Sequence, residues 1–210
     1  MSATGRSDVR DPSDHYTTPA YCVRRLLERV QPPGGLWLEP CAGSGAVIKA
    51  VAAIRPDVLF HAVECRDECI PILDRILTCQ VAVRGSFQQV PPDDRYACAI
   101  SNPPFRSALA FVQHALKFAP IVIMLLRLNW LASRTRNAWL RTHVPNIYVL
   151  PDRPSFVGGT TDATDYAWML WHREENVAGL VELLATTPAE ERRGSPDRER
   201  GQLSLLGDAA

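Results

Sequence analysis

Leu36-Trp37-Leu38-Glu39-Pro40-Cys41-Ala42-Gly43-Ser44-Gly45 leads from a short apolar run through a glycine turn into an apolar segment at 46–54. The run is typical of a buried strand, and glycines let the backbone turn tightly and pass close to a ligand. This strand–turn–helix unit is not a P-loop, because no Gly-Lys-Ser/Thr follows, and Ile48 replaces the third glycine of the dinucleotide fingerprint. A generic βα turn remains the alternative.

The same alternation of strands and helices continues along the chain. We expect strands at 36–38, 58–63, 80–83, 96–100, 121–126, 146–150 and 166–171. We expect helices at 19–30, 46–54, 67–77, 107–118 and 133–142. The pattern predicts one α/β domain with a doubly wound, Rossmann-like, mostly parallel seven-stranded sheet and helices on both faces. Such sheets bind ligands at the carboxyl ends of their strands.

Both ends of the chain differ from the middle. Residues 1–14 are polar, and residues 187–210 combine proline, glycine and dense alternating charge. Segments of this composition bury too little apolar surface to offset the entropy of ordering. We therefore expect disorder at both ends, and one compact domain at 15–186.

Composition limits the class of protein. The chain has 210 residues, 46% of them hydrophobic, and 23 cationic against 23 anionic side chains. The longest apolar run, 121–126, is far shorter than the ~20 residues of a membrane span. Neutral charge argues against coating nucleic acid by bulk electrostatics but leaves room for a local basic face. The six cysteines match no zinc spacing, so we expect reduced thiols, a cytoplasmic protein and no metal site.

Two carboxylates follow predicted strands. Glu39, just before the glycines, would repel a pyrophosphate and suits a cationic amino group. About 20 residues later the second strand ends in His61-Ala62-Val63-Glu64. A carboxylate in that place can accept hydrogen bonds from ribose hydroxyls. The alternative for Glu64 is an ordinary surface residue at a strand end.

The most specific motif is Ser101-Asn102-Pro103-Pro104-Phe105, after the predicted strand at 96–100. Two prolines after an asparagine fix an extended, rigid backbone. The side-chain oxygen of Asn102 and the carbonyl of Pro103 can then accept the hydrogens of one planar NH2 group. Phe105 offers a face for stacking on the ring that carries this amine. A rigid turn with no chemistry is the alternative.

These motifs resemble those of class I S-adenosylmethionine-dependent amino-methyltransferases with an Asn-Pro-Pro-aromatic motif. Residues 16–171 are most similar to small adenine-N6 DNA methyltransferases of bacteria and their phages. The resemblance implies S-adenosyl-L-methionine as cofactor, S-adenosyl-L-homocysteine as product, no metal, and direct methyl transfer to adenine N6 in DNA. Methylation of cytosine N4, an RNA base or a protein glutamine, and an inactive binding module, stay open as alternatives.

The resemblance assigns roles residue by residue. It implies cofactor contacts from Tyr16, Thr17, Thr18, Pro19, Glu39, Pro40, Cys41, Ala42, Gly43, Gly45, Glu64, Ser86, Phe87 and Asn102. It implies catalysis by Asn102, Pro103, Pro104 and Phe105. Ser86 departs from the family, which often has an aspartate there to bind the cofactor's adenine amine.

Substrate contacts are expected from arginines and a late aromatic residue. Phe156, in Arg153-Pro154-Ser155-Phe156, resembles the family's aromatic residue that lies against a flipped base. The arginines expected to hold DNA are Arg106, Arg127, Arg134, Arg136 and Arg153, with a solvated helix face as the alternative for those near 134–136. No insertion resembles a target recognition domain.

The tail carries a partner motif. Gln202-Leu203-Ser204-Leu205-Leu206 resembles the short peptide by which bacterial DNA enzymes dock on the replication sliding clamp. In that mode the glutamine side chain forms hydrogen bonds and the leucines fill an apolar groove. A chance match or a fragment of terminal helix is the alternative.

Overall fold

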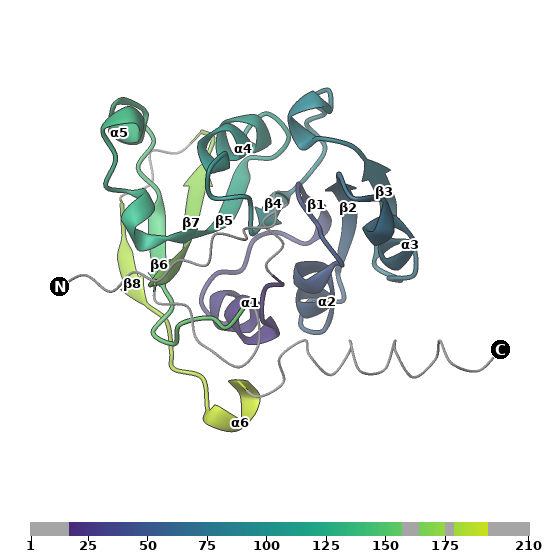
Figure 1. Ribbon diagram of the computed structural model, residues 1–210, viewed down its shortest axis with the longest axis horizontal. Coiled ribbons are helices and arrows are strands. Elements are labelled where there is room, and N and C mark those ends of the chain that lie inside the picture. Colours follow the sequence, from purple (N-terminus) through teal and green to yellow (C-terminus); the bar gives the residue numbers. More distant parts are fainter. Residues whose placement is uncertain (1–16, 157–163, 175–178, 193–210) are drawn as a thin grey trace, which may run out of the picture.

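The computed structural model describes residues 17–156, 164–174 and 179–192, which build a single eight-stranded sheet (Figure 1). The strands are β1 (Gly35–Glu39), β2 (Val58–Glu64), β3 (Cys79–Arg84), β4 (Cys98–Ser101), β5 (Ile121–Arg127), β6 (Asn146–Val149), β7 (Tyr166–His172) and β8 (Val181–Leu183). Their order is β3-β2-β1-β4-β5-β7-β6-β8. Neighbours among β1 to β5 pair in parallel, whereas β7 is antiparallel to both β5 and β6.

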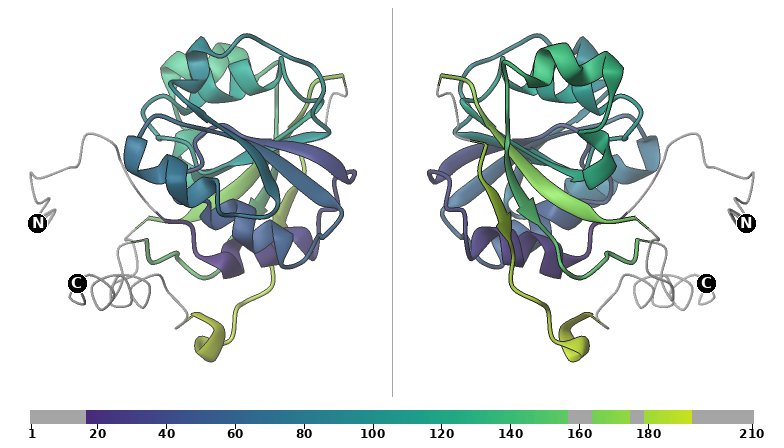
Figure 2. Two further views of the ribbon diagram at one scale, coloured as in Figure 1. Left: turned by 90° about the vertical axis from the view of Figure 1, so that its right-hand side faces the viewer. Right: turned by 90° about the vertical axis from the view of Figure 1, so that its left-hand side faces the viewer.

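Helices cover both faces of the sheet (Figure 2). They are α1 (Ala20–Leu27), α2 (Ala46–Ala52), α3 (Ile70–Leu73), α4 (Ala108–Ala115), α5 (Arg134–Leu140) and α6 (Ala189–Arg192). The helices α1 and α2 lie on one face, and α4 and α5 lie on the other.

Strand β5 shows why both faces are filled. All its residues from 121 to 126 are buried, and they alternate between two apolar clusters. Ile123 and Leu125 pack on the α1–α2 side, while Met124 and Leu126 pack on the α4–α5 side. Side chains of a strand alternate between faces, so a continuous apolar run is typical of a strand covered on both sides.

The predicted doubly wound, mostly parallel sheet is confirmed, with one more strand than expected. The extra strand β8 pairs in parallel with β6 at the sheet edge. Val181 and Leu183 are largely exposed, so the strand has no buried apolar face for a sequence pattern to reveal. Backbone pairing and the ion pair between Glu182 and Arg29 hold it instead.

Two other segments differ from the expected elements. The helix predicted at 67–77 is a 3-10 turn followed by the short α3, which has Pro71 in its first turn. The chain also continues past residue 186 against the domain: Thr187 is buried, and its amide donates to Asp152, which pairs with Arg192. Within the described residues, no helix has the length and apolar character needed to cross a membrane.

The strand order reverses between β1 and β4. β1 leads through α2 to β2 on one side, whereas β4 leads through α4 to β5 on the other. The connecting loops therefore separate at the carboxyl ends of β1 and β4 and leave a crevice, which is where open α/β sheets bind ligands. The glycine loop and the Asn-Pro-Pro-Phe motif both start at this edge.

Candidate functional site

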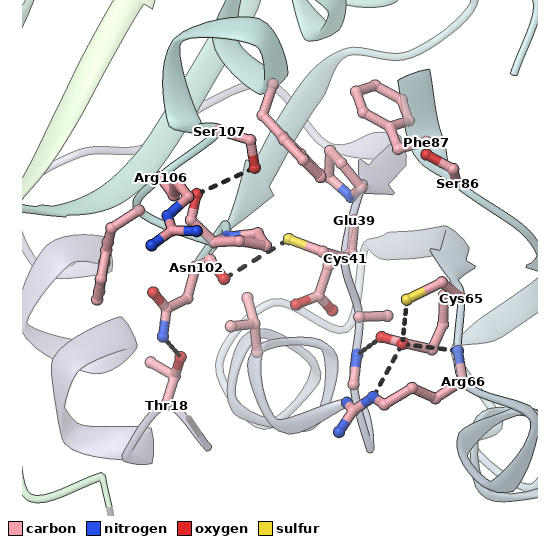
Figure 3. A pocket seen from close by; sticks show the side chains of 18 of the residues that line it. Thr18, Glu39, Cys41, Cys65, Arg66, Ser86, Phe87, Asn102, Arg106 and Ser107 are labelled. Atoms are coloured by element: carbon pink, nitrogen blue, oxygen red, sulfur yellow. Dashed lines mark hydrogen bonds and ion pairs between the residues drawn. The ribbon is translucent and has the colours of Figure 1, made fainter. Parts of the chain in front are cut away.

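A cavity of about 930 Å³ lies at the carboxyl ends of β1, β2, β4 and β5. Its lining includes Glu39, Cys41, Glu64, Asn102 and Phe105, so one cavity joins the motifs of three strand ends (Figure 3). Cavities that hold small-molecule ligands and cofactors have volumes of about 300–1,000 Å³.

The loop between β1 and α2 needs its glycines. Gly43 and Gly45 have φ values of 55° and 77°, a left-handed conformation that other residues rarely adopt. A Cβ on Gly45 would also stand 2.3 Å from Cδ1 of Ile76. The backbone therefore passes close to the side chains of Leu73 in α3 and of Ile76 after it. Ala42 and Gly43 line the cavity.

Glu64 connects the glycine loop to β2. Its Oε2 accepts a hydrogen bond from the Gly43 amide at 2.6 Å, and its Oε1 accepts from the amide and Nε of Arg66 at 3.0 Å each. Burial acts to raise the pKa of Glu64, but the hydrogen bonds from Arg66 and Gly43 outweigh it and hold the pKa below its usual range. Glu64 is thus an anion fixed at the cavity wall.

Glu39 is a different kind of carboxylate. Only 2% of the residue is exposed, and its Oε2 has no hydrogen-bond partner among the described residues. Burial, together with the negative charge of Glu64, raises its pKa well above the usual value. A buried carboxylate oxygen without a donor is costly, so this cavity wall suits a ligand that brings a cationic donor.

Asn102 is held on two sides. Its Nδ2 donates to Oγ1 of the buried Thr18 at 3.1 Å, and its backbone carbonyl accepts from the Cys41 thiol at 3.5 Å (Figure 3). The same thiol lies 2.8 Å from Oγ of Ser101. Because the NH2 group of Asn102 points at Thr18, the side-chain oxygen faces another direction. Thr18, predicted to contact the cofactor, therefore orients the amide and also lines the cavity.

The aromatic face of the motif has a cationic neighbour. The guanidinium carbon of Arg127 lies 4.7 Å from the centre of the Phe105 ring, and its Nε donates to the Tyr166 hydroxyl at 3.2 Å. Phe105 and Arg127, both predicted to contact the substrate, line the cavity. Phe156 does not: it is buried and packs edge-on against Tyr166, with ring centres 5.1 Å apart. Burying an apolar ring is favourable in free energy, so Phe156 packs on Tyr166 outside the cavity lining.

The predicted arginines fall into two groups. Arg106, Arg127 and Arg136 line the cavity. Arg134 instead lies in a shallow depression at the start of α5, and Arg153 pairs with Asp165 at 2.7 Å on the surface. Side chains two positions apart on a helix point in different directions. Arg134 and Arg136 therefore line different parts of the surface.

Two of the predicted cofactor contacts follow strand β3. Ser86 and Phe87 line the cavity, and the Ser86 hydroxyl donates to Gln88 at 2.8 Å. Phe87 is 2% exposed and packs on Phe111, with ring centres 5.7 Å apart. A firmly packed ring edge can flank a flat ligand ring.

The remaining predicted residues are placed as follows. Thr17, Pro40, Cys41, Ala42 and Pro104 line the cavity, whereas Pro19, Gly45 and Pro103 are not among its lining residues. Tyr16 and the peptide at 202–206 lie outside the described residues. Sequence reasoning missed Arg66 and Gln88, which hold Glu64 and Ser86, and also Asn129 and Trp130 in the lining. The position of Arg66 two residues after Glu64 was the available signal for one of them.

Comparisons with known proteins identify structures of similar fold. No sequence-family profile matches the chain, and no curated protein matches it. A putative class I S-adenosylmethionine-dependent methyltransferase from Listeria monocytogenes aligns over 96% of this chain and 73% of its own, with 12% identity and a TM-score of 0.61. A putative RNA methyltransferase from Pyrococcus horikoshii aligns over 79% and 90%, with 14% identity and a TM-score of 0.60.

A third similar structure is a modification subunit of a putative type I restriction enzyme from Vibrio vulnificus. It aligns over 93% of this chain with 13% identity and a TM-score of 0.56, and this chain spans 53% of its length. At identities this low, a structural similarity is evidence for the fold alone, and the three structures share one fold. The chain therefore has the fold of the class I S-adenosylmethionine-dependent methyltransferases.

Proposed function

We propose that this protein methylates the exocyclic N6 amine of adenine in DNA, with S-adenosylmethionine as the methyl donor. The observation that carries the proposal is the joint lining of one cavity by Asn102, Phe105, Glu39 and Glu64. Glu39 suits the amino group of an amino acid and Glu64 suits a ribose. Both lie in the same cavity as Asn102 and Phe105, which suit a planar amine.

The cavity fits the cofactor on several counts. Oε2 of Glu39, buried without a partner among the described residues, would accept a hydrogen bond from the cofactor's ammonium group. An ionised carboxylate offers about four acceptor positions, so Glu64 can bind ribose hydroxyls beside Gly43 and Arg66. Phe87 and Ser86 would flank the adenine ring. S-adenosylmethionine, when bound, supplies an electrophilic methyl group on its sulfonium.

The residues around the motif would prepare the target amine. Oδ1 of Asn102 and the carbonyl of Pro103 accept its two hydrogens, which draws the nitrogen toward tetrahedral geometry and frees its lone pair. Thr18 holds the amide in the orientation that this needs. Phe105 stacks on the base, and a stacked base gains about 1–3 kcal/mol. The contribution of the protein is alignment and electrostatics, because an amide is too weak a base to remove a proton.

The cellular test is expression in bacteria that lack DNA methylation, followed by genome sequencing that detects modified bases. The proposal predicts N6-methyladenine in the wild type and none with Asn102→Ala. N4-methylcytosine instead would identify the other DNA amine as target. If the purified protein shows no binding of S-adenosylmethionine at millimolar concentration, the fold serves as a binding module and the enzyme proposal is wrong.

We also propose that Gln202 to Leu206 dock the enzyme on the replication sliding clamp. The support is the motif itself, in a tail of disorder-prone composition. Purified clamp should capture the full chain and fail to capture a variant that ends at residue 201, while both bind cofactor equally. Equal capture of both chains would refute the docking role.

A further inference from the structure

One long segment of the sequence contains no acidic residue. Asp94 and Asp152 are successive acidic residues, so the segment 95–151 holds none. The same segment holds seven cations: Arg95, Arg106, Lys117, Arg127, Arg134, Arg136 and Arg141. Because the whole chain is neutral, the remainder carries seven net negative charges. The zero net charge is therefore the sum of a basic segment and an acidic remainder.

The fold keeps this segment together on one side of β1. It forms β4, α4, β5, α5 and β6, and it includes the Asn-Pro-Pro-Phe motif. The acidic residues that flank its two ends are already engaged, since Asp93 pairs with Arg95, Asp94 pairs with Arg173, and Asp152 pairs with Arg192. These three carboxylates are therefore already paired with other arginines.

Segment 95–151 differs from the rest of the described chain in how its arginines are paired. Among the described residues outside 95–151, every arginine except Arg75 pairs with a carboxylate: Arg24, Arg25, Arg29, Arg55, Arg66, Arg84, Arg153, Arg173 and Arg192. Within the described part of the chain, no carboxylate lies within 4.0 Å of Arg106, Arg134, Arg136 or Arg141. A surface that leaves its arginines without carboxylates favours an anionic ligand.

These four arginines form a path from the cavity outward. Arg106 and Arg136 line the cavity, and Arg136 donates to the Trp130 carbonyl at 2.7 and 2.9 Å, which fixes its guanidinium. Arg134 and Arg141 are exposed. They stand seven residues apart, which places them on one face of α5 and its end. Figure 1 shows α5 beyond α4, at the far end of the molecule from β3.

We propose that Arg106, Arg134, Arg136 and Arg141 form a phosphodiester-binding surface for the nucleic acid whose base enters the cavity. The identity of that base rests on the proposed function. Guanidinium groups bind phosphate oxygens in pairs, and each phosphate contact releases condensed counterions. An acidic peptide would also complement the positive charge of these arginines. The cavity that they lead to is lined by Asn102 and Phe105, which suit a base rather than a peptide side chain.

The test compares matched arginines by fluorescence anisotropy on a labelled DNA duplex of random sequence, without cofactor, over a series of salt concentrations. Arg134→Ala and Arg141→Ala should each weaken binding about three- to tenfold and lower the log–log salt slope by about 1. Arg75→Ala is the control, because Arg75 is exposed after α3 and has no ion pair with a described residue. It should change neither quantity.

Two other outcomes would decide against the surface. Equal losses with Arg75→Ala would show that only total charge matters, and wild-type protein that prefers polyglutamate to the duplex would identify an acidic protein as partner. Thermal melting and calorimetry with S-adenosylmethionine should be unchanged in all three variants, since none of these arginines lines the cavity. Duplex binding without cofactor binding would refute the proposed function and leave the surface standing.

Discussion

The two ends of the cavity are built in opposite ways. At the end beside β1 and β2, Glu39 and Glu64 are 2% and 4% exposed, and the surrounding groups control their pKa values. At the end beside β4 and β5, Arg106 is exposed and Arg136 is half-buried. Buried charges need exact partners, whereas open charges tolerate many. The buried end suits a small ligand of fixed shape, and the open end suits a polymer.

The residue between the two ends should give the largest effect. Asn102→Ala removes the acceptor aimed at the target amine, so methyl transfer should fall about 10²–10³-fold, as when one preorganised donor or acceptor is lost. Affinity for S-adenosylmethionine should change only a few-fold. Initial rates with labelled cofactor and calorimetry provide the two readings. A variant that keeps most of its activity would remove Asn102 from the proposed chemistry.

At the buried end, Glu39→Gln keeps the shape of the side chain and removes its charge. A hydrogen bond to a charged group contributes about 1.5–3 kcal/mol, so cofactor affinity should fall about 10–100-fold. The matched control is Glu182→Gln, a surface carboxylate paired with Arg29, which should leave affinity unchanged. Equal affinity of wild type and Glu39→Gln in calorimetry would show that the cofactor's amino group binds elsewhere.

The hydrogen bond from Asn102 to Thr18 should give a smaller effect. Thr18→Val retains the volume and removes the hydroxyl oxygen that accepts from Nδ2. One hydrogen bond contributes about 0.5–1.5 kcal/mol, so kcat should fall up to about tenfold while the KM for cofactor stays nearly constant. Thr18→Ser should restore the rate. A change in KM alone would mean that Thr18 acts on the cofactor and not through Asn102.

The smallest effect concerns stability and pH. Burial and Glu64 raise the pKa of Glu39 in the folded chain above its unfolded value. Its contribution to stability is therefore complete below the unfolded pKa, about 4.3, and is lost as the pH rises through the folded pKa. Ligand-free Glu39→Gln should then melt a few degrees higher than wild type at alkaline pH, with the difference shrinking toward pH 5. A variant that melts lower at every pH would contradict the cost assigned to this carboxylate.

The sequence predicts the buried end better than the open end. Glu39, Glu64 and Asn102 follow strands whose apolar runs are plain in the sequence, so their meeting at one sheet edge follows from the topology. Phe156, predicted to lie against a flipped base, is buried outside the cavity lining, and its packing on Tyr166 depends on how β7 pairs with β5. Strand β8 was missed because its exposed side chains leave no pattern.

The most direct test of the central claim is a methyl-transfer reaction with labelled S-adenosylmethionine and unmethylated duplex DNA, analysed as nucleosides after digestion. We predict that the label appears in N6-methyl-2′-deoxyadenosine with the wild type, and at about a hundredth of that rate or less with Asn102→Ala. Label in that nucleoside at equal levels with both proteins, or wild type that binds the cofactor and the duplex yet labels no nucleoside, would contradict the proposed role of this cavity.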